Sequence, residues 1–574
     1  MQNKRLVLLM GLLLSIFMAL LGRIFYYQVI KGAEISRQAA AMRSQKIELR
    51  EFNRGDILDR NLFSLTSTRT SPALYIATSL INRPANMNLN NDESASPTVN
   101  DQVYSDWAQY LAQILINKDE RAILKDIKAI TPGAQFIRLH TNLSPLEIER
   151  INASQKFGLI VAPFINRYQE DGFCAHLLGY VSQGEDGQGQ SGLERTYNAI
   201  LQSSTSSQEL VSVVDARGQP IQGLVPKLRN QPKSNGTVVL TIDKRIQEVV
   251  EKAMDQRVEK GAAVVMDIHT KEILAMVSRP TFNPYQINDI IAFDNRSTLT
   301  NRALSKYNPG SIFKILLSLA ALEEGQVSMD EKFNCSGKYR FNDQVTTACW
   351  KEEGHGTLTL AQAFANSCNP TFIQIGLRLG RTQVLKYVDK LHITDETIIG
   401  YSPGNMGTYV RIEGGEPALG NASLGQKGVM ISPLQIASLL ATVASDGTWA
   451  SPSLVRYTVD QTGHKNVLVN DEREQVISSA TAGKVRQLLE KVVEEGTGKA
   501  AAIPEVRVAG KTATSQTGRM KSADEEILNT WFAGYLPADE PRWAIVVMAE
   551  EGSSGAQTCA PIFRDISRGI LEYY

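Results

Sequence analysis

A serine and a lysine three residues apart lie in an almost entirely apolar segment. From residue 311 to 322 the only polar side chains are Ser311, Lys314 and Ser318, a spacing that places them on one face of a helix. A helix that is apolar nearly all round is buried, and burial disfavours a charged lysine, so the pKa of Lys314 should fall toward neutrality. A neutral amine one turn from a serine hydroxyl is a nucleophile with its base. The bare spacing also arises by chance, so the apolar setting carries this interpretation.

A second group of polar residues surrounds Cys368. Ser367 and Asn369 flank it, between a helical pattern and Pro370, in a position typical of a turn that projects side chains into a cleft. Taken alone, the pair is better explained as ordinary helix capping.

The third group is Lys511-Thr512-Ala513-Thr514. A phosphate loop is excluded because the first glycine of its motif would fall at Glu505. In a strand, the alternation of side chains places Thr512 and Thr514 on one face. Two hydroxyls near a lysine make a ledge that can bind a carboxylate.

The segments around these groups predict an α+β fold, with an antiparallel sheet flanked by helices. Periodicity indicates an amphipathic helix over 243–259 and a strand pair at 261–267 and 272–278. Further apolar strands are expected at 238–242, 506–514, 530–535 and 543–549.

The composition excludes several classes of protein. The chain has 574 residues, and Lys+Arg and Asp+Glu both total 60, which argues against a nucleic-acid binder. Its length predicts two or three domains. Five cysteines without a C-x-x-C pair and six histidines without an H-E-x-x-H motif lead us to expect no bound metal.

The N-terminus predicts a membrane anchor. Residues 6–21 are apolar apart from Ser15, follow Lys4 and Arg5, and are extended beyond Arg23 by more apolar residues, so that residues 6–27 can span a bilayer. The alternative is a cleaved signal peptide, but bulky residues stand where small ones should precede the cleavage site. The positive charges place the N-terminus in the cytoplasm and predict a single-pass protein of the cell membrane with an extracytoplasmic body.

Together, the three groups resemble the active-site motifs of the penicillin-recognising serine transferases, S-x-x-K, S-x-N and K-T-G in that order. Residues 54–61 (RGDILDRN) look like the signature of the class B penicillin-binding proteins just outside the membrane. Other segments similar to that class are 175–181, 192–194, 239–243, 273–278, Gly425-Gln426 and 433–435. The resemblance covers nearly the whole chain. It implies an anchor at 1–31, a mixed α/β pedestal and docking domain at 32–235 and a transpeptidase domain at 236–574.

The resemblance also implies the roles of the site residues and no cofactor. Ser311 would attack the penultimate D-Ala carbonyl of a peptidoglycan stem peptide, and Lys314 would take its proton. Ser367 would relay the proton to the leaving amine, and Asn369 would hold the substrate amide. Lys511 would keep Lys314 neutral, while Thr512 and Thr514 would bind the terminal carboxylate. The backbone N–H groups of Ser311 and Thr514 would form the oxyanion hole.

Partners follow from the same resemblance. They are stem peptides, β-lactams, the membrane and, because no glycosyltransferase segment precedes residue 236, a glycan polymerase of the SEDS type; no nucleic acid is expected. The alternative function is a catalytically weak penicillin-binding scaffold or β-lactam sensor. A carboxypeptidase or β-lactamase fits poorly with the long anchored N-terminal part.

Two residues depart from the family pattern. Ala513 stands where the family has a glycine, and pleat alternation points its methyl group toward the Lys511 side and the catalytic helix. Overpacking there would disturb the site, so Ala513→Gly is expected to raise acylation by benzylpenicillin several-fold, an estimate scaled from the effect of misplaced catalytic groups. Leu62 also stands where a glycine usually follows D-R-N, which affects a turn.

Two of the five cysteines leave an alternative open. Cys335 and Cys349 either form a disulfide, which can persist outside the membrane, or are two buried thiols. His355 is interpreted as structural, since the family's chemistry uses no histidine.

Overall fold

The computed structural model describes residues 2–32, 34–35, 44–49, 54–67, 69–77, 98–116, 118–128, 136–154, 159–182, 187–202, 208–213, 227–229, 236–468, 472–522 and 525–574. The chain divides into two compact units, each built from separate segments. Unit 1 comprises Met1–Asn53, Arg69–Asn166 and Ser204–Lys233, and unit 2 comprises Arg54–Thr68, Arg167–Ser203 and Ser234–Tyr574. Residues 230–235, next to the expected domain boundary, lie outside the described residues.

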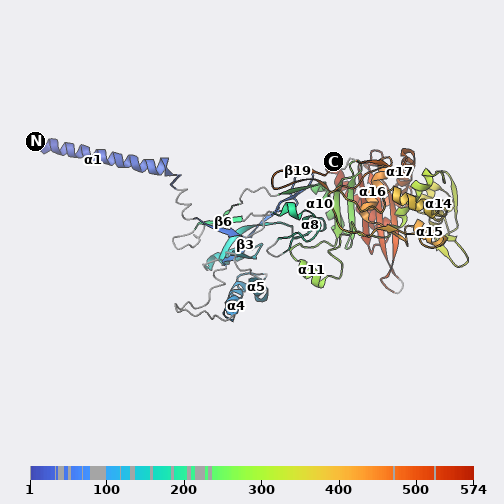
Figure 1. Cartoon of the computed structure of the whole chain (residues 1–574), viewed down its shortest axis with the longest axis horizontal. Coiled ribbons are helices and arrows are strands. Elements are labelled where there is room, and N and C mark those ends of the chain that lie inside the picture. The colour runs from blue at the N-terminus through green and yellow to red at the C-terminus, as the bar shows by residue number, and fades with distance from the viewer. Residues whose placement is uncertain are drawn as a thin grey trace. The chain divides into compact units, whose positions relative to one another are not determined.

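Unit 1 begins with a long apolar helix. Helix α1 (Gln2–Phe25) runs into a short π-helix, η1 (Tyr26–Ile30), drawn in blue in Figure 1. Residues Val7–Ile30 are long and apolar enough to cross a membrane, and their large apolar side chains are exposed. The predicted N-terminal apolar helix is thus confirmed, and its length and exposed apolar surface are consistent with a single membrane-spanning anchor.

The rest of unit 1 contains two small antiparallel sheets. One has the order β4-β3-β5 and packs against α4 and α5, and the other has the order β1-β6-β7. Helix α6 starts with a capping box in which Ser144 and Glu147 satisfy each other's backbone N–H groups. The bounds are β1 (Ser44–Leu49), β3 (Arg69–Ala77), α4 (Thr98–Ala112), α5 (Glu120–Lys128), β4 (Phe136–His140), α6 (Pro145–Ala153), β5 (Leu159–Asn166), β6 (Gln208–Val213) and β7 (Lys227–Arg229).

Unit 2 is organised around a five-stranded antiparallel sheet. Its order is β10-β9-β23-β22-β21, so strands from the start and end of the unit lie side by side, green against red in Figure 1. The strands are β9 (Gly261–Asp267), β10 (Ile273–Arg279), β21 (Ala509–Met520), β22 (Glu526–Leu536) and β23 (Trp543–Glu550). This confirms the predicted antiparallel sheet.

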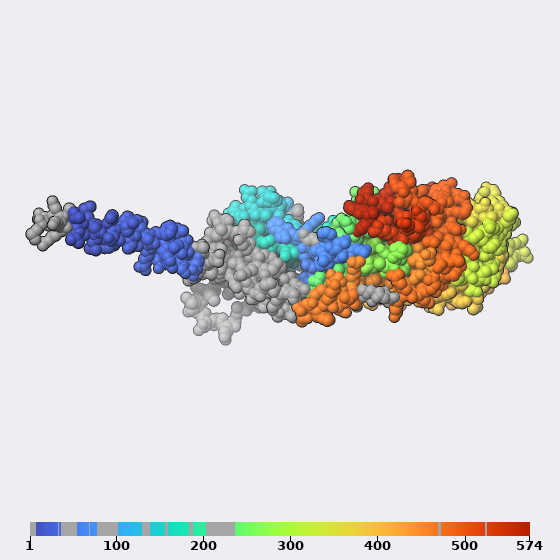
Figure 2. Space-filling view, turned by 90° about the horizontal axis from the view of Figure 1, so that it is seen from above, coloured from blue at the N-terminus to red at the C-terminus, as the bar shows by residue number. Residues whose placement is uncertain are grey.

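Helices cover both faces of this sheet. Helices α10 (Lys244–Asp255) and α18 (Ala560–Leu571) contribute to one apolar core, while α12 (Lys314–Glu323) and α16 (Pro433–Ala444) contribute to a larger core on the other face. Strands β9, β10 and β23 are buried almost throughout because both faces of the sheet are covered there, whereas the second half of β21 is largely exposed. In Figure 2 the green to red residues of unit 2 form one continuous body.

The other elements of unit 2 connect and border these layers. They are β2 (Ile57–Leu58), α7 (Ala175–Leu178), α8 (Gly192–Thr196), α9 (Asn198–Leu201), β8 (Thr237–Leu240), α11 (Ile287–Phe293), η2 (Gly310–Phe313), β11 (Lys332–Cys335), β12 (Lys338–Arg340), β13 (Thr346–Ala348), β14 (Gly356–Thr359), α13 (Leu360–Ala365), α14 (Asn369–Lys390), β15 (Tyr409–Val410), α15 (Glu416–Ser423), β16 (Val429–Met430), β17 (Thr448–Trp449), β18 (Val455–Val459), β19 (Lys465–Val467), β20 (Glu474–Gln475), α17 (Ser479–Glu494), η3 (Lys499–Ala501) and η4 (Gly555–Cys559).

The segment 54–61 is held in unit 2 by buried ion pairs. Arg54 Nε and Arg167 Nε each donate to the fully buried Glu194 carboxylate at 2.5 Å. Burial raises the pKa of Glu194, but Arg167 and Arg54 outweigh it and hold that pKa below its usual value. Gly55 is required beside them, because a Cβ there would lie 1.8 Å from Gly236 O.

Leu62 adopts the left-handed conformation, with φ of 67° and a side chain that is 58% exposed. This conformation costs a non-glycine residue roughly 1–2 kcal/mol, and the exposed side chain returns little packing energy. We therefore expect Leu62→Gly to stabilise unit 2 by about 0.5–1 kcal/mol, after the greater freedom of glycine in the unfolded chain is subtracted.

Thermal unfolding of the two proteins measures this effect. The matched control is Phe63→Gly, since Phe63 is equally exposed and follows directly in the chain. It is not among the residues with positive φ, so its replacement should destabilise. A lower melting temperature for Leu62→Gly would contradict the prediction.

Candidate functional site

Ser311 lies in the single 3₁₀ turn η2 that precedes α12, whose first residue is Lys314. Gly310 has φ of 55°, and Gly425 packs so closely against it that a Cβ on Gly425 would lie 2.1 Å from Gly310 O. The Asn308 side chain donates to Gln426 O at 2.9 Å and Val429 O at 2.8 Å. These contacts fix the backbone just before the serine.

Ser367 and Asn369 lie at the junction of α13 and α14, facing that turn. Ser367 is in the left-handed conformation, with φ of 53°, a strained state that is retained where the surroundings require it and that clusters at functional sites. Asn369 is the first residue of α14, before Pro370. The turn predicted around Cys368 is thus present.

One hydrogen-bonded group joins the side chains of Ser311, Lys314, Ser367 and Asn369. Ser367 Oγ lies 2.9 Å from Ser311 Oγ and 3.3 Å from Lys314 Nζ. Lys314 Nζ also donates to Ser367 O at 2.9 Å and Asn369 Oδ1 at 2.8 Å. A neutral amine has two N–H donors for these two oxygens and a lone pair left for the Ser367 hydroxyl. The structure thus places the hydroxyl of Ser367 between Lys314 Nζ and Ser311 Oγ.

Burial controls the charge of the two lysines at the site. Lys314 and Lys511 are both fully buried. Burial lowers the pKa of Lys314 to about 7, and burial together with the charge of Lys314 lowers the pKa of Lys511 well below its usual value. Near neutral pH the pair therefore includes neutral amine, which is the form that can accept a proton.

Strand β21 forms the opposite wall. It is the edge strand of the sheet and packs along η2. The Ser515 hydroxyl donates to Asn308 O at 2.8 Å, so the face shared by Lys511, Ala513 and Ser515 is turned toward η2, the turn that carries Ser311. An edge strand has unpaired backbone groups that can bind an extended peptide.

Thr512 and Thr514 lie on the other face of β21. Thr512 Oγ1 is 2.6 Å from Thr497 Oγ1, and Thr514 Oγ1 accepts from Gly555 N at 3.3 Å. Thr514 is exposed, whereas Thr512 is 6% exposed. The two hydroxyls thus differ in accessibility.

Sequence reasoning missed Thr497. This residue lies in the Gly-Thr-Gly turn after α17, and its N–H donates to Ala365 O at 3.2 Å, two residues before Ser367. It therefore joins the Ser367 turn to β21. The signal in the sequence was a single threonine between two glycines. No neighbouring residue links this turn to strand β21, which begins twelve residues later.

Sequence reasoning also missed a group of sulfur and nitrogen atoms behind the Ser367 turn. Cys335, Cys349, His355 and Cys368 bring their ligand atoms within 4.8 Å of one another. The structure gives Cys335 and Cys349 as buried free thiols, the second of the two alternatives. We expected no bound metal because the sequence lacks the standard metal-binding motifs. These four side chains escape such motifs because they are spread over residues 335–368.

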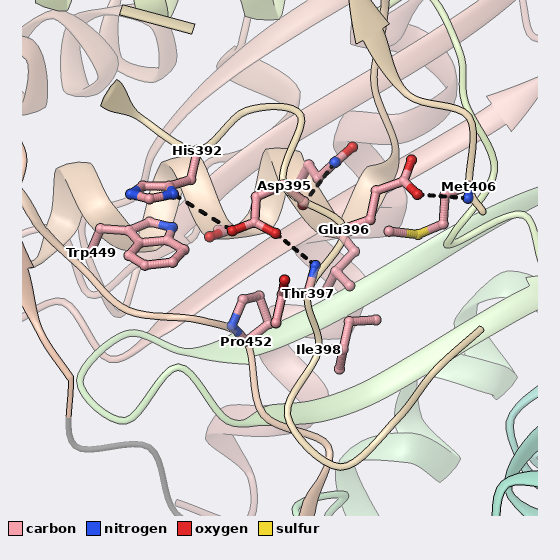
Figure 3. Close-up of a pocket in the computed structure, with 11 residues that line it drawn as sticks. His392, Asp395, Glu396, Thr397, Ile398, Met406, Trp449 and Pro452 are labelled. Atoms are coloured by element: carbon pink, nitrogen blue, oxygen red, sulfur yellow. Dashed lines mark hydrogen bonds and ion pairs between the residues drawn. The ribbon is translucent and has the colours of Figure 1, made fainter. Parts of the chain in front are cut away.

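Two cavities lie apart from these residues. One is a small pocket of about 10 Å³ beside His392, Asp395, Glu396 and Trp449, shown in Figure 3. The other is an open cleft of about 650 Å³ that includes Tyr307, Arg519 and Glu550. No predicted catalytic or substrate-binding residue lines either cavity.

The chain is similar to known families and proteins over most of its length. Residues 261–568 match the penicillin-binding protein transpeptidase domain, and residues 50–241 match the penicillin-binding protein dimerisation domain. Stage V sporulation protein D of Bacillus subtilis is 29% identical over 99% of this chain and 85% of its own length. Peptidoglycan D,D-transpeptidase FtsI of Escherichia coli is 25% identical over 99% and 91%.

Solved structures agree on the fold. Penicillin-binding protein 3 of Mycobacterium tuberculosis, complexed with aztreonam, is 23% identical and has a TM-score of 0.61, with 92% of this chain and 97% of that chain covered.

Proposed function

Because the chain belongs to the penicillin-binding protein transpeptidase family, with a dimerisation domain before the transpeptidase domain as in the class B members, we propose that it cross-links peptidoglycan stem peptides. The reaction is a D,D-transpeptidation through an acyl-enzyme on Ser311, with release of terminal D-Ala, and β-lactams acylate the same serine. The observation that carries the proposal is the continuous contact of Ser311, Ser367 and a buried Lys314.

Acylation uses the proton path that these contacts provide. The hydroxyl hydrogens can rotate, so Ser311 can pass its proton to Ser367 while Ser367 passes its own to Lys314. This route goes through Ser367, whereas the sequence expectation was direct transfer from Ser311 to Lys314. In the reverse direction the same path delivers a proton to the leaving amine.

The substrate lies between the catalytic turn and β21. An extended stem peptide adds to the open edge of this strand, with Asn369 beside its amide and the exposed Thr514 at its terminal carboxylate. Thr512, held by Thr497, orients that end of the strand. The N–H groups of Ser311 and Thr514 serve as the oxyanion hole, an arrangement that contributes about 3–4 kcal/mol in other acyl-transfer enzymes.

The N-terminal helix anchors the enzyme to the cell membrane. Lys4 and Arg5 before it place the N-terminus in the cytoplasm and the chain that follows the helix outside. The residues between the anchor and 235 dock partner proteins, including a SEDS-type glycan polymerase that supplies the glycan strands.

The test uses the full chain in detergent, a stem pentapeptide that ends in D-Ala-D-Ala and an acceptor amine. We expect release of D-Ala together with the cross-linked product, both blocked by prior treatment with benzylpenicillin. Penicillin labelling without any release of D-Ala would reject the transpeptidase and favour the scaffold or sensor.

Acylation by benzylpenicillin should depend on pH through Lys314. Its pKa is lowered to about 7, so the neutral base is populated above that pH and lost below it. We expect the acylation rate constant to be level above about pH 8 and to fall roughly tenfold per unit well below pH 7. Stopped-flow measurements between pH 5 and 9 check this, and a flat profile would show that Lys314 does not act as the base.

Ala513→Gly tests the one departure inside the catalytic motifs. Ala513 is 4% exposed and lies on the face of β21 that packs along η2. The register of β21 with β22 is regular from Ala509 to Gln516, so the alanine leaves strand pairing undisturbed. The several-fold increase in the acylation rate constant for benzylpenicillin stays a prediction, and stopped-flow acylation of the two proteins measures it. Equal rates would show that the pocket has repacked around Ala513.

A further inference from the structure

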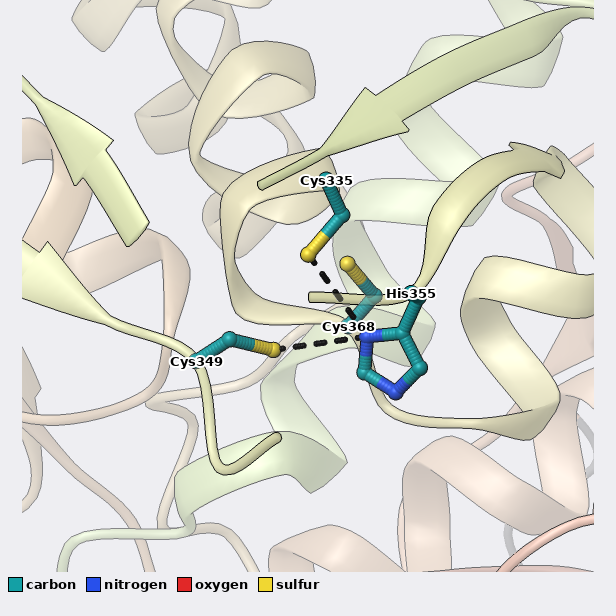
Figure 4. A group of neighbouring side chains, drawn as sticks. All are labelled: Cys335, Cys349, His355 and Cys368. Atoms are coloured by element: carbon teal, nitrogen blue, oxygen red, sulfur yellow. Dashed lines mark hydrogen bonds between the residues drawn. The ribbon is translucent and has the colours of Figure 1, made fainter. Parts of the chain in front are cut away.

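Three thiols and an imidazole converge behind the catalytic turn. Cys335 Sγ lies 3.6 Å and Cys349 Sγ 3.5 Å from His355 Nδ1, and Cys368 Sγ belongs to the same cluster. Figure 4 shows all four side chains pointing toward a common centre. The three cysteines are at most 3% exposed.

The separations suit a tetrahedral metal ion. With Zn–S of about 2.3 Å and Zn–N of about 2.0–2.1 Å, tetrahedral angles give S···N of about 3.6 Å and S···S of about 3.8 Å. The two S···N distances already have that value, and every other pair lies within 4.8 Å. Small side-chain movements would complete the site.

Hydrogen bonding alone accounts poorly for this arrangement. A neutral imidazole with its proton on Nε2 has one lone pair at Nδ1, yet two thiols approach that atom. Among the described residues, His355 Nε2 is buried and has no hydrogen-bond partner. A cation at the centre would satisfy Nδ1 and all three sulfurs at once.

The backbone is shaped to bring the ligands together. Strands β11 and β14 pair with Cys335 opposite Gly356, next to His355, and Cys349 N donates to Gly337 O at 2.7 Å. Gly337 and Gly354 both have positive φ, of 89° and 82°. A Cβ on Gly354 would lie 2.3 Å from Cys335 O, so this close approach requires glycine.

The cluster is linked directly to the catalytic turn. Cys368 stands between Ser367 and Asn369 in the chain. The Asn369 amide donates to Ala348 O at 3.3 Å, beside Cys349, and Trp350 Nε1 donates to Asn366 O at 2.8 Å. Whatever fixes the cluster therefore also fixes the segment that carries Ser367 and Asn369.

We propose that Cys335, Cys349 and Cys368 as thiolates and His355 through Nδ1 bind one Zn²⁺ ion. Four protein ligands leave no open position, which is typical of a structural rather than a catalytic zinc site. The ion joins the segment 335–356 to the Ser367 turn. It also protects the thiols, since a thiolate bound to zinc is not free to form a disulfide.

The experiment measures metal in the full-length protein, purified in detergent with a non-thiol reductant and without added metal. Elemental analysis should find about one zinc per chain. Cys349→Ser and His355→Ala should each lower this content at least fivefold. The control, Cys559→Ser, changes a buried cysteine outside the cluster and should keep the full content.

Two further measurements on the wild-type protein test the proposal even if a variant fails to fold. Removal of zinc from the wild-type protein with a chelator should lower its melting temperature by several degrees, and added Zn²⁺ should restore it. Added Co²⁺ should give the visible absorption of tetrahedral thiolate coordination.

Two results would overturn the proposal. One is a metal-free protein in which mass spectrometry after alkylation finds a disulfide within the cluster. The other is a metal-free protein with all five thiols reactive after denaturation and no uptake of Zn²⁺ or Co²⁺. The readout is the metal itself, so either result leaves the transpeptidase proposal untouched.

Discussion

Ser311→Ala is expected to abolish covalent labelling by fluorescent penicillin while leaving the fold intact. The variant lacks the only hydroxyl that the structure places at the start of α12 within reach of Ser367, so no acyl-enzyme can form. The side chain is not part of the apolar core, and its loss should cost less than about 1 kcal/mol of folding free energy. Labelling gels and thermal unfolding of the purified full chain measure the two effects separately.

The matched control is Ser318→Ala in the same helix. Ser318 is fully buried, and its hydroxyl donates to Lys314 O at 2.8 Å, without reaching the nucleophile. This variant should keep labelling within about threefold, as expected for a substitution that leaves the reacting groups in place. Labelling that survives in Ser311→Ala would mean that another residue is acylated.

Lys314→Met should lower the acylation rate constant by on the order of 10³-fold. Methionine fills a similar volume in the buried site but cannot accept the proton that reaches it through Ser367. It also leaves Ser367 O and Asn369 Oδ1 without their donor, so the turn that carries both residues loses part of its support. Stopped-flow acylation by benzylpenicillin measures the change.

Lys271→Met is the control, because it makes the same substitution at another buried lysine. Burial lowers the pKa of Lys271 to about 7 as well, but its amine donates to Ile268 O, Ala441 O and Ser445 Oγ, all outside the catalytic group. It should keep the acylation rate of the wild type even if it lowers stability. Equal losses in the two variants would mean that the effect at Lys314 is structural.

The sheet and the turn and helix that begin at Ser311 could be predicted because their signals are local. Strands β9 and β10 are continuous apolar runs around a short turn, and the apolar stretch after Ser311 indicates a buried helix wherever it packs. The pKa of Lys314 followed from burial alone. These inferences need only periodicity and composition within a few residues.

Features that depend on contacts between segments far apart in the sequence could not be predicted. The position of the Ser367 hydroxyl between Ser311 and Lys314 depends on contact between two turns that are 56 residues apart, where the two serine Oγ atoms lie 2.9 Å from each other. Segments Arg54–Thr68 and Arg167–Ser203 belong to unit 2, although their composition resembles the chain around them. The cysteine and histidine cluster likewise forms only when β11, β14 and the start of α14 meet.

The most direct test of the central claim is the location of the penicillin adduct in the wild-type protein. After treatment with benzylpenicillin and proteolysis, mass spectrometry should find the acyl group on the peptide that carries Ser311, with fragment ions that place it on that residue. An adduct on Ser367 or elsewhere, or no adduct at saturating drug, would contradict the account.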